Sequence, residues 1–146
     1  MSKTRANDSY VFDTSALLTL WNDEDGADLV ESLLRQDLDV YVSFMSYMEG
    51  RYRIWKNVGK EESDKFSRYL ELLPLRRIDM TDLILEKAVE IKAMGSLSVC
   101  DAWIIGTAIA LDSTLVHKDP EFEQVKTLVK VKALPYKPLK NGKKNS

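Results

Sequence analysis

Apolar and polar residues alternate with two different periods along the chain, and together they predict strands and helices in turn. Five short runs rich in β-branched or apolar residues predict strands at 9–12, Val40–Ser43, Leu75–Ile78, 114–117 and 128–132. Six longer segments have apolar residues at helical spacing and predict helices at 14–21, 25–36, 45–58, 61–73, from Thr81 to about Met94, and 99–111. This alternation favours an α/β fold with three layers (α/β/α), in which a central, mostly parallel sheet of about five strands is covered on both faces.

The length and composition predict one globular domain. The chain has 146 residues, of which 45% are hydrophobic and 30% charged, as is usual for a soluble protein with its own core. We expect a flexible N-terminus at 1–8, a single domain at 9–136 and a basic, disordered tail at 137–146. The chain has a single cysteine, which fits a reducing compartment, and shows no apolar segment of about 20 residues. We therefore expect a cytoplasmic protein with no membrane partner.

The charge is unevenly distributed. The formal net charge is −2, yet the tail contains Lys137, Lys140, Lys143 and Lys144 and no acidic residue. The rest of the chain is therefore acidic and lacks the basic surface of a dedicated nucleic-acid binder. If a polyanion is the substrate, a metal ion and a few local cations must offset the repulsion. The tail is either a solubilising end or an auxiliary contact for RNA.

Four acidic residues lie where the chain is expected to turn from strand to helix: Asp13, Glu49, Asp101 and Asp119. Ligands of parallel α/β sheets bind beyond the carboxyl ends of the strands, so these distant residues can converge at one edge. Two close carboxylates repel by about 4 kcal/mol at an effective dielectric of about 20. A divalent cation relieves this repulsion, and oxygen ligands suit Mg²⁺ or Mn²⁺.

Each acidic residue also has an ordinary structural interpretation. Asp13 can cap the helix that follows it, and Asp101 can belong to a capping box that begins at Ser98. Glu49 can form a surface ion pair with Arg53, four residues later. Asp119 can form a turn ahead of a helix that starts with proline. Taken singly, none of the four acids identifies a catalytic site.

Four segments together resemble the motifs of the PIN-domain nuclease family. An apolar strand ends in Asp followed by Thr or Ser in Val11–Leu18, and a helix after the second strand has an acid in Ser43–Glu49. Asp101–Ala108 is similar to the third motif, and Leu115–Phe122 to the fourth, which has Phe three residues after its Asp. The resemblance covers residues 10–131 and implies a PIN-like fold. One position departs from the pattern: many members have Thr or Ser where this chain has its only histidine, His117.

The resemblance implies a metal-dependent endonuclease that acts most often on RNA. It makes Asp13 and Asp101 the direct ligands of Mg²⁺ or Mn²⁺, with Glu49 and Asp119 completing the site or bridging through water. Four further residues are candidates for substrate binding: Ser15, Arg53, Lys56 and His117. For His117 the alternatives are a phosphate contact, a proton carrier near the metal, or a strand-end residue without a chemical role.

Other reaction types lack their residues. The lone histidine has no obvious partners for a Ser–His–Asp or Cys–His nucleophile, and the chain has no Gly-x-x-x-x-Gly-Lys loop for nucleoside triphosphates. The resemblance leaves two functions open. The first is a ribonuclease, either the toxin of a VapBC-type pair with an antitoxin partner or a stand-alone enzyme, and a homodimer or larger homo-oligomer in either case. The alternative is a non-catalytic RNA-binding or scaffold module; a phosphatase is a weaker third possibility.

Overall fold

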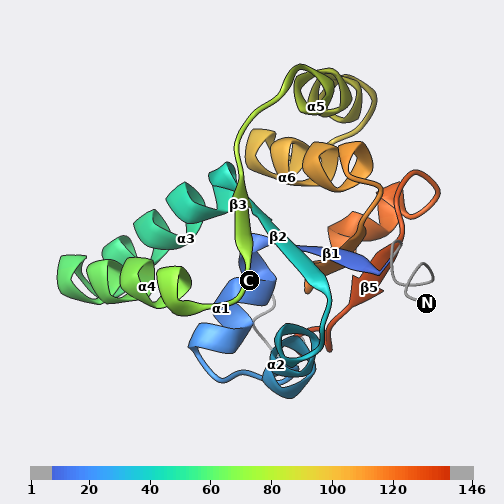
Figure 1. Cartoon of the computed structure of the whole chain (residues 1–146). Coiled ribbons are helices and arrows are strands. Elements are labelled where there is room, and N and C mark those ends of the chain that lie inside the picture. The colour runs from blue at the N-terminus through green and yellow to red at the C-terminus, as the bar shows by residue number, and fades with distance from the viewer. Residues whose placement is uncertain (1–7, 139–146) are drawn as a thin grey trace.

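Five short strands form one parallel sheet at the centre of the protein (Figure 1). The computed structural model describes residues 8–138. The strands are β1 (Ser9–Phe12), β2 (Asp39–Ser43), β3 (Arg76–Ile78), β4 (Thr114–His117) and β5 (Val131–Ala133). They lie in the order β3-β2-β1-β4-β5, and all four pairings are parallel. The expected α/β fold with a five-stranded central sheet is confirmed.

Strand β1 occupies the middle of the sheet, between β2 and β4. Val11 is in register with Tyr41 of β2 on one side and with Leu115 of β4 on the other. The strand order reverses at β1 and β4, because the chain first builds outward through β2 and β3 and then returns to the other side of β1. In such sheets the reversal leaves a crevice at the carboxyl ends of the two strands, where ligands bind.

Helices cover both faces of the sheet (Figure 1). On one face lie α1 (Thr14–Trp21), α2 (Ala27–Arg35), α3 (Phe44–Asn57) and α4 (Lys60–Leu72). On the other face lies α6 (Val99–Ala110), with α5 (Asp82–Met94) packed on its outer side. A 3₁₀ helix, η2 (Pro120–Val125), follows β4 directly. None of the helices among residues 8–138 has both the length and the apolar character needed to cross a bilayer.

Alternate residues of the central strands supply two separate hydrophobic cores. Phe12 and Val116 are fully buried against the α1–α4 side, while Val11 and Leu115 are fully buried against α6. Successive strand residues point to opposite faces, and both faces are covered, so these strands are apolar without interruption. This explains why the two strands that position the candidate acids show no polar alternation.

Helix starts follow the capping residues in the sequence. The side chains of Ser43, Thr81 and Ser98 each accept a hydrogen bond from a backbone N–H in the first turn of α3, α5 and α6. Ser98 therefore fixes where α6 begins, and with it the position of Asp101 in the first turn.

The C-terminal part differs in detail from the expected pattern. A strand was expected at 128–132, but β5 begins at Val131. The amides of Leu128 and Val129 both donate to the carbonyl of Val125, so these two apolar residues close a turn after η2. Val129 is buried in the core, whereas Leu128 is 56% exposed, and neither belongs to β5. Residues 1–7 and 139–146, which contain most of the expected terminal segments, lie outside the described residues.

Candidate active site

The fold brings the four candidate acids to the carboxyl end of the sheet. Asp13 follows β1 and Asp119 follows β4, and these strands are neighbours in the sheet. Glu49 lies on α3, which begins directly after β2, and Asp101 lies in the first turn of α6. Electrostatic coupling links Asp13 to Asp101 and Glu49, and links Asp101 to Glu49 and Asp119. The four acids therefore form one cluster.

Asp13 is the most buried acid of the cluster, with only 4% of its surface exposed. Its Oδ1 accepts hydrogen bonds from the amide of Ala16 at 2.8 Å and from the hydroxyl of Ser15 at 2.7 Å. Burial raises its pKa to about 7, with smaller contributions from Asp101 and Glu49, although the two hydrogen bonds oppose the rise. Asp13 therefore caps α1, as expected. A helix cap does not need to be buried close to other carboxyl groups, so capping alone does not account for this environment.

Ser15 connects the ends of the two central strands. Its hydroxyl donates to the carboxylate of Asp13 after β1 and accepts the amide of Lys118 after β4, at 3.0 Å. Ser15 therefore orients the carboxylate of Asp13. The same bonds fix the spacing between the two loops that carry acids.

Glu49 is oriented by a residue of α1 rather than by its own helix. Its Oε1 accepts a 2.6 Å hydrogen bond from the hydroxyl of Thr14, and the hydroxyl of Ser46 lies 3.1 Å from that of Thr14. No ion pair joins Glu49 to Arg53 within residues 8–138. The surface-pair interpretation of Glu49 is therefore wrong, and its carboxylate is held in the acidic cluster.

Three carboxylates at the mouth of the cluster can share one cation. Ligand atoms of Asp101, Asp119 and Glu121 all lie within 4.8 Å of one another. Burial raises the pKa of Asp101 to about 6, with smaller contributions from the charges of Glu49, Asp119 and Glu121, although a hydrogen bond with Ser98 opposes the rise. The donors are all oxygen atoms, which fits a hard divalent cation such as Mg²⁺ or Mn²⁺.

Sequence reasoning did not identify Glu121. It lies in the first turn of η2, where its amide donates to Oδ1 of Asp119 at 2.9 Å. This tight turn places two acids separated by one residue beside Asp101. The only signal in the sequence was the pair of acids around Pro120, which had been interpreted as a turn. Thr14, the partner of Glu49, was likewise noted only as part of the first motif.

His117 lies behind the cluster and has no exposed surface. Its Nδ1 accepts the amide of Asp119 at 3.1 Å, and its ring lies 5.1 Å from that of Phe122 and 6.1 Å from that of Tyr136. Burial lowers its pKa, which favours the neutral ring. A direct phosphate contact, one of the expected roles, does not fit this position, because the side chain cannot reach solvent. The contacts favour a structural role at the strand end.

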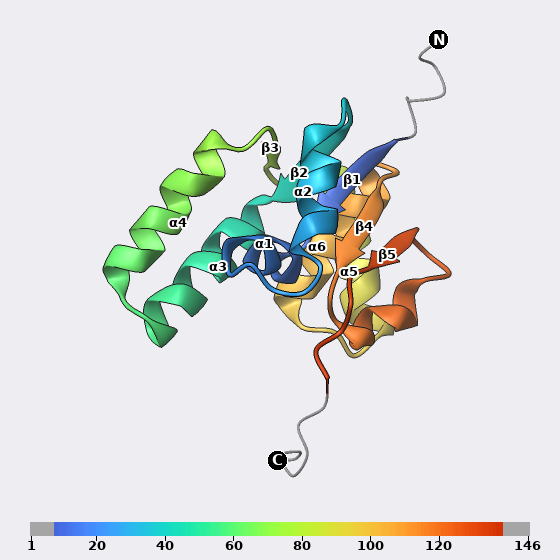
Figure 2. The same cartoon turned by 90° about the horizontal axis from the view of Figure 1, so that it is seen from below.

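A cleft of about 1070 Å³ reaches the edge of the acidic cluster at Asp119, the one acid of the cluster among its described lining residues. Ser15, Lys118 and Asp119 line it from the strand ends, and α1, the end of α3 and the start of α4 form further walls. In Figure 2, α1, α3 and α4 lie on the side of the sheet toward which the chain runs after β5. Arg53, a candidate for substrate binding, lines the cleft. Lys56 is exposed on α3 but does not line the cleft.

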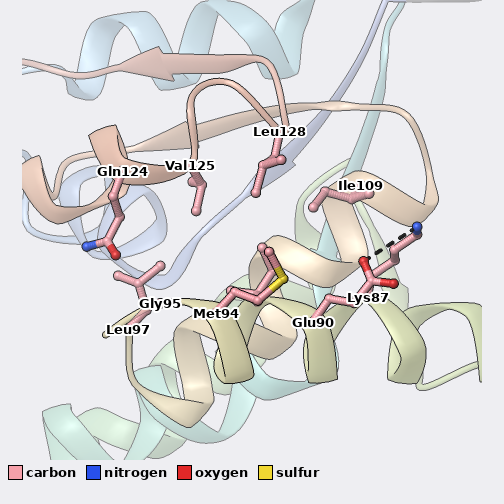
Figure 3. Close-up of a pocket in the computed structure, with 10 residues that line it drawn as sticks. Lys87, Glu90, Met94, Gly95, Leu97, Ile109, Gln124, Val125 and Leu128 are labelled. Atoms are coloured by element: carbon pink, nitrogen blue, oxygen red, sulfur yellow. Dashed lines mark ion pairs between the residues drawn. The ribbon is translucent and has the colours of Figure 1, made fainter.

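A smaller, apolar hollow of about 290 Å³ lies between α5, α6 and the segment around η2 (Figure 3). Met94, Leu97 and Leu128 are among its lining residues, and the ion pair of Lys87 and Glu90 lies at one end. None of the clustered acids lines this hollow. It therefore has no part in the chemistry of the acidic site.

The whole arrangement identifies the family. The PIN domain model matches residues 10–128, which is most of the chain. The chain therefore belongs to the PIN-domain family. No curated protein matches it.

Solved structures of the same fold come from bacterial toxin–antitoxin systems. The chain is similar to VapBC2 of Rickettsia felis bound to a promoter DNA fragment, with a TM-score of 0.73 and 20% identity, covering 87% of this chain and 99% of that one. It is also similar to Mycobacterium tuberculosis VapC20, described as a sarcin–ricin loop cleaving toxin, with a TM-score of 0.69 and 17% identity over 86% of this chain and 99% of that one. At these identities the likeness shows the shared fold.

Proposed function

We propose that the protein is a metal-dependent endoribonuclease that hydrolyses phosphodiester bonds at the acidic cluster. The observation that carries this proposal is the convergence of Asp13, Glu49, Asp101 and Asp119 from four separate segments onto one edge of the sheet. Such a convergence of carboxyls is unfavourable without a cation. Membership of the PIN-domain family supports the same function.

Asp101, Asp119 and Glu121 are the residues that would hold Mg²⁺ or Mn²⁺, with Asp13 and Glu49 at the inner side of the cluster. A bound divalent cation supplies Lewis-acid chemistry, which makes water more acidic and offsets the charge that develops on the phosphate.

The chain's own residues supply orientation and proton handling. Ser15 and Thr14 hold the carboxylates of Asp13 and Glu49 in fixed positions, so little reorganisation is needed when substrate binds. The carboxyl of Asp13, with its pKa of about 7, can accept a proton near neutral pH. Arg53 lines the cleft, where a guanidinium can contact a phosphate.

Cleavage of an RNA panel tests the proposal. Structured and unstructured RNAs are incubated with wild-type protein in Mg²⁺, Mn²⁺ or EDTA, beside Asp13→Asn and Asp101→Asn. Metal-dependent cleavage that both substitutions abolish is the expected result. Glu86→Gln, which changes an exposed acid of α5 outside the cluster, is the matched control and should cleave normally. Metal-independent RNA binding without any cleavage would reject the nuclease in favour of a binding module.

A role as the toxin of a toxin–antitoxin pair is the more specific form of this proposal. Its support is the likeness to structures of VapBC systems, together with an open cleft beside the acids into which a partner segment can enter. Induced expression of the wild-type chain should then arrest bacterial growth, whereas Asp101→Asn should not. Growth unaffected by an active wild-type enzyme would favour a stand-alone ribonuclease.

We also propose self-association through the outer face of α3. Met48, Tyr52 and Trp55 follow one another at helical spacing, and each has 43–50% of its surface exposed. A row of large exposed apolar side chains is typical of a protein interface. Light scattering should give the mass of a dimer for the wild type and that of a monomer for Tyr52→Asp. A monomeric wild type would contradict this part of the proposal.

A further inference from the structure

The last described residues form a strap across one side of the cleft. This strap, Leu134–Pro138, follows β5 and begins after residue 128, where the match to the family model ends. Leu134 is buried, and its amide donates to the carbonyl of His117 at 2.7 Å. Pro135 packs on Gly26, where a Cβ atom would lie 3.1 Å from the proline Cδ. The backbone of the strap is therefore fixed to β4 and to the loop before α2.

Side chains of the strap reach both neighbouring segments. The hydroxyl of Tyr136 donates to Glu123 of η2 at 2.8 Å, and Nζ of Lys137 lies 3.4 Å from Oε2 of Glu24. Tyr136, Lys137 and Pro138 all line the cleft that also contains Ser15 and Asp119. The strap thus forms a wall of the cleft that reaches Asp119.

Two lysines share Glu24, but they differ in accessibility. The side chain of Lys118 is 4% exposed, and its ammonium also donates to the carbonyl of Asp25 at 2.8 Å. The side chain of Lys137 is 70% exposed. An exposed ion pair contributes about 0–1 kcal/mol, so the ammonium of Lys137 can exchange the carboxylate of Glu24 for another anion at little cost. Lys118 is structural, whereas Lys137 is available to a ligand.

A second available cation faces the cleft from another wall. Arg53 is exposed on α3 and forms no ion pair with any residue of the described range 8–138. The cleft between these walls is large enough for nucleotide-sized groups, since small-molecule sites span about 300–1,000 Å³. Asp119 lies in the same cleft as the two cations. A polyanion lying there would meet Arg53 and Lys137 on two walls, in a cleft that is also lined by Glu24, Glu62 and Asp119.

We propose that Lys137 is a phosphate-binding residue of this cleft, and that Arg53 and Lys137 together hold a phosphodiester chain beside the acidic cluster. The proposal rests on the ribonuclease function and names a further part of its substrate site. A lysine ammonium binds phosphate as a point charge and carries no sequence preference.

Binding measured without cleavage tests the proposal. The anisotropy of a labelled, unstructured RNA oligonucleotide is followed in the Asp13→Asn background with Mn²⁺ at several KCl concentrations. Adding Lys137→Ala should weaken binding severalfold and lower the slope of log K against log salt by about 0.7, the contribution of one phosphate contact in single strands. Lys137→Arg should restore both. Lys126→Ala is the matched control, because Lys126 is 63% exposed, pairs with Glu123 at 3.7 Å and lies outside the cleft.

A second variant separates a phosphate contact from a purely structural tether. If Lys137 only ties the strap to Glu24, Glu24→Gln should weaken RNA binding as much as Lys137→Ala does, which would overturn the proposal. We expect Glu24→Gln to leave binding unchanged or tighter, because it frees Lys137. Thermal unfolding is recorded for each variant, since Glu24→Gln also removes a partner of the buried Lys118.

Other outcomes have equally definite meanings. An unchanged salt slope in Lys137→Ala, tighter binding in that variant, or no RNA binding by any variant would overturn the role of Lys137. Cleavage by the wild-type protein is followed separately. If RNA binding depends on Lys137 but the wild-type protein does not cleave RNA, the phosphate contact stands and the nuclease function is rejected. If the wild-type protein cleaves RNA but the salt slope of Lys137→Ala is unchanged, the nuclease function stands and the phosphate contact is rejected.

Discussion

The hydroxyl of Thr14 donates a 2.6 Å hydrogen bond to Oε1 of Glu49 and so joins the first turn of α1 to the middle of α3. Thr14 is buried, with 3% of its surface exposed. The bond connects two of the motifs that the sequence had placed 35 residues apart. It makes the orientation of Glu49 depend on a neighbour that carries no charge.

Replacing Thr14 by valine should weaken metal binding without unfolding the protein. Valine keeps the shape but removes the donor, so Glu49 loses its orienting partner, and a hydrogen bond to a charged group contributes about 1.5–3 kcal/mol. Calorimetric titration with Mn²⁺ should show a higher Kd for Thr14→Val and a nearly normal one for Thr14→Ser. Equal affinities for valine and wild type would mean that Glu49 takes no part in metal binding.

Replacing Asp13 by asparagine should stabilise the metal-free protein above neutral pH. Because the folded-state pKa of Asp13 is raised from 3.8 to about 7, ionising this carboxyl opposes folding. One pKa unit corresponds to about 1.36 kcal/mol, which sets an upper bound of about 4 kcal/mol at pH 8. Urea denaturation in EDTA measures the difference, and a less stable variant would contradict the pKa shift.

The advantage of Asp13→Asn should depend on pH in a defined direction. Between pH 3.8 and about 7 the folded wild type keeps a proton on Asp13 that the unfolded chain has lost. The contribution of Asp13 to stability therefore falls as pH rises through this window. His117 has a lowered pKa and acts in the opposite sense, but it is present in both proteins and cancels in the difference. The two stabilities should converge near pH 4; a constant difference would show that ionisation of Asp13 is not the cause.

Replacing Glu121 by glutamine should weaken Mn²⁺ binding, because Glu121 is one of three carboxylates whose ligand atoms lie within 4.8 Å of one another. An affinity loss of about tenfold corresponds to about 1.4 kcal/mol and is readily measured by titration. Glu86→Gln on α5 serves as the control and should bind normally. Unchanged binding by Glu121→Gln would remove Glu121 from the candidate metal site.

Replacing Gly106 by alanine should destabilise the fold. A Cβ atom at Gly106 would lie 2.8 Å from the backbone nitrogen of Ala88 and 3.1 Å from the carbonyl oxygen of Ile84. The obstacle is the backbone of α5, so α5 and α6 must move apart, at a cost of about 1–3 kcal/mol. The midpoint of urea unfolding should fall for Gly106→Ala and stay nearly constant for Glu86→Ala on the exposed face of α5. A Gly106→Ala protein of normal stability would show that the two helices separate easily.

Local patterns in the sequence were sufficient to predict most of the fold. Apolar runs marked the central strands because both faces of the sheet are covered, and caps such as Thr81 and Ser98 marked helix starts. Periodicity alone could not say which side of α3 is buried. Tyr52 and Trp55 lie on the exposed side, with 43% and 50% of their surface accessible.

The candidate site was predictable only in part. The positions of Asp13 and Asp119 follow from strand order, since acids after neighbouring parallel strands share one edge. The place of Glu121 depends on the 3₁₀ turn, and the ring of His117 lies near that of Tyr136, which lies on the strap beyond the family match. These contacts arise from loop geometry and from long-range packing, which no local pattern encodes.

The hydrogen bond from the Lys118 amide to the Ser15 hydroxyl has a consequence for how the site can be observed. This N–H is satisfied by a side chain from the opposite loop instead of by a sheet partner. Its exchange with deuterated solvent therefore reports whether the loops after β1 and β4 stay together. One backbone proton, followed by NMR, would monitor the opening of the edge that carries the acidic cluster while the rest of the sheet remains folded.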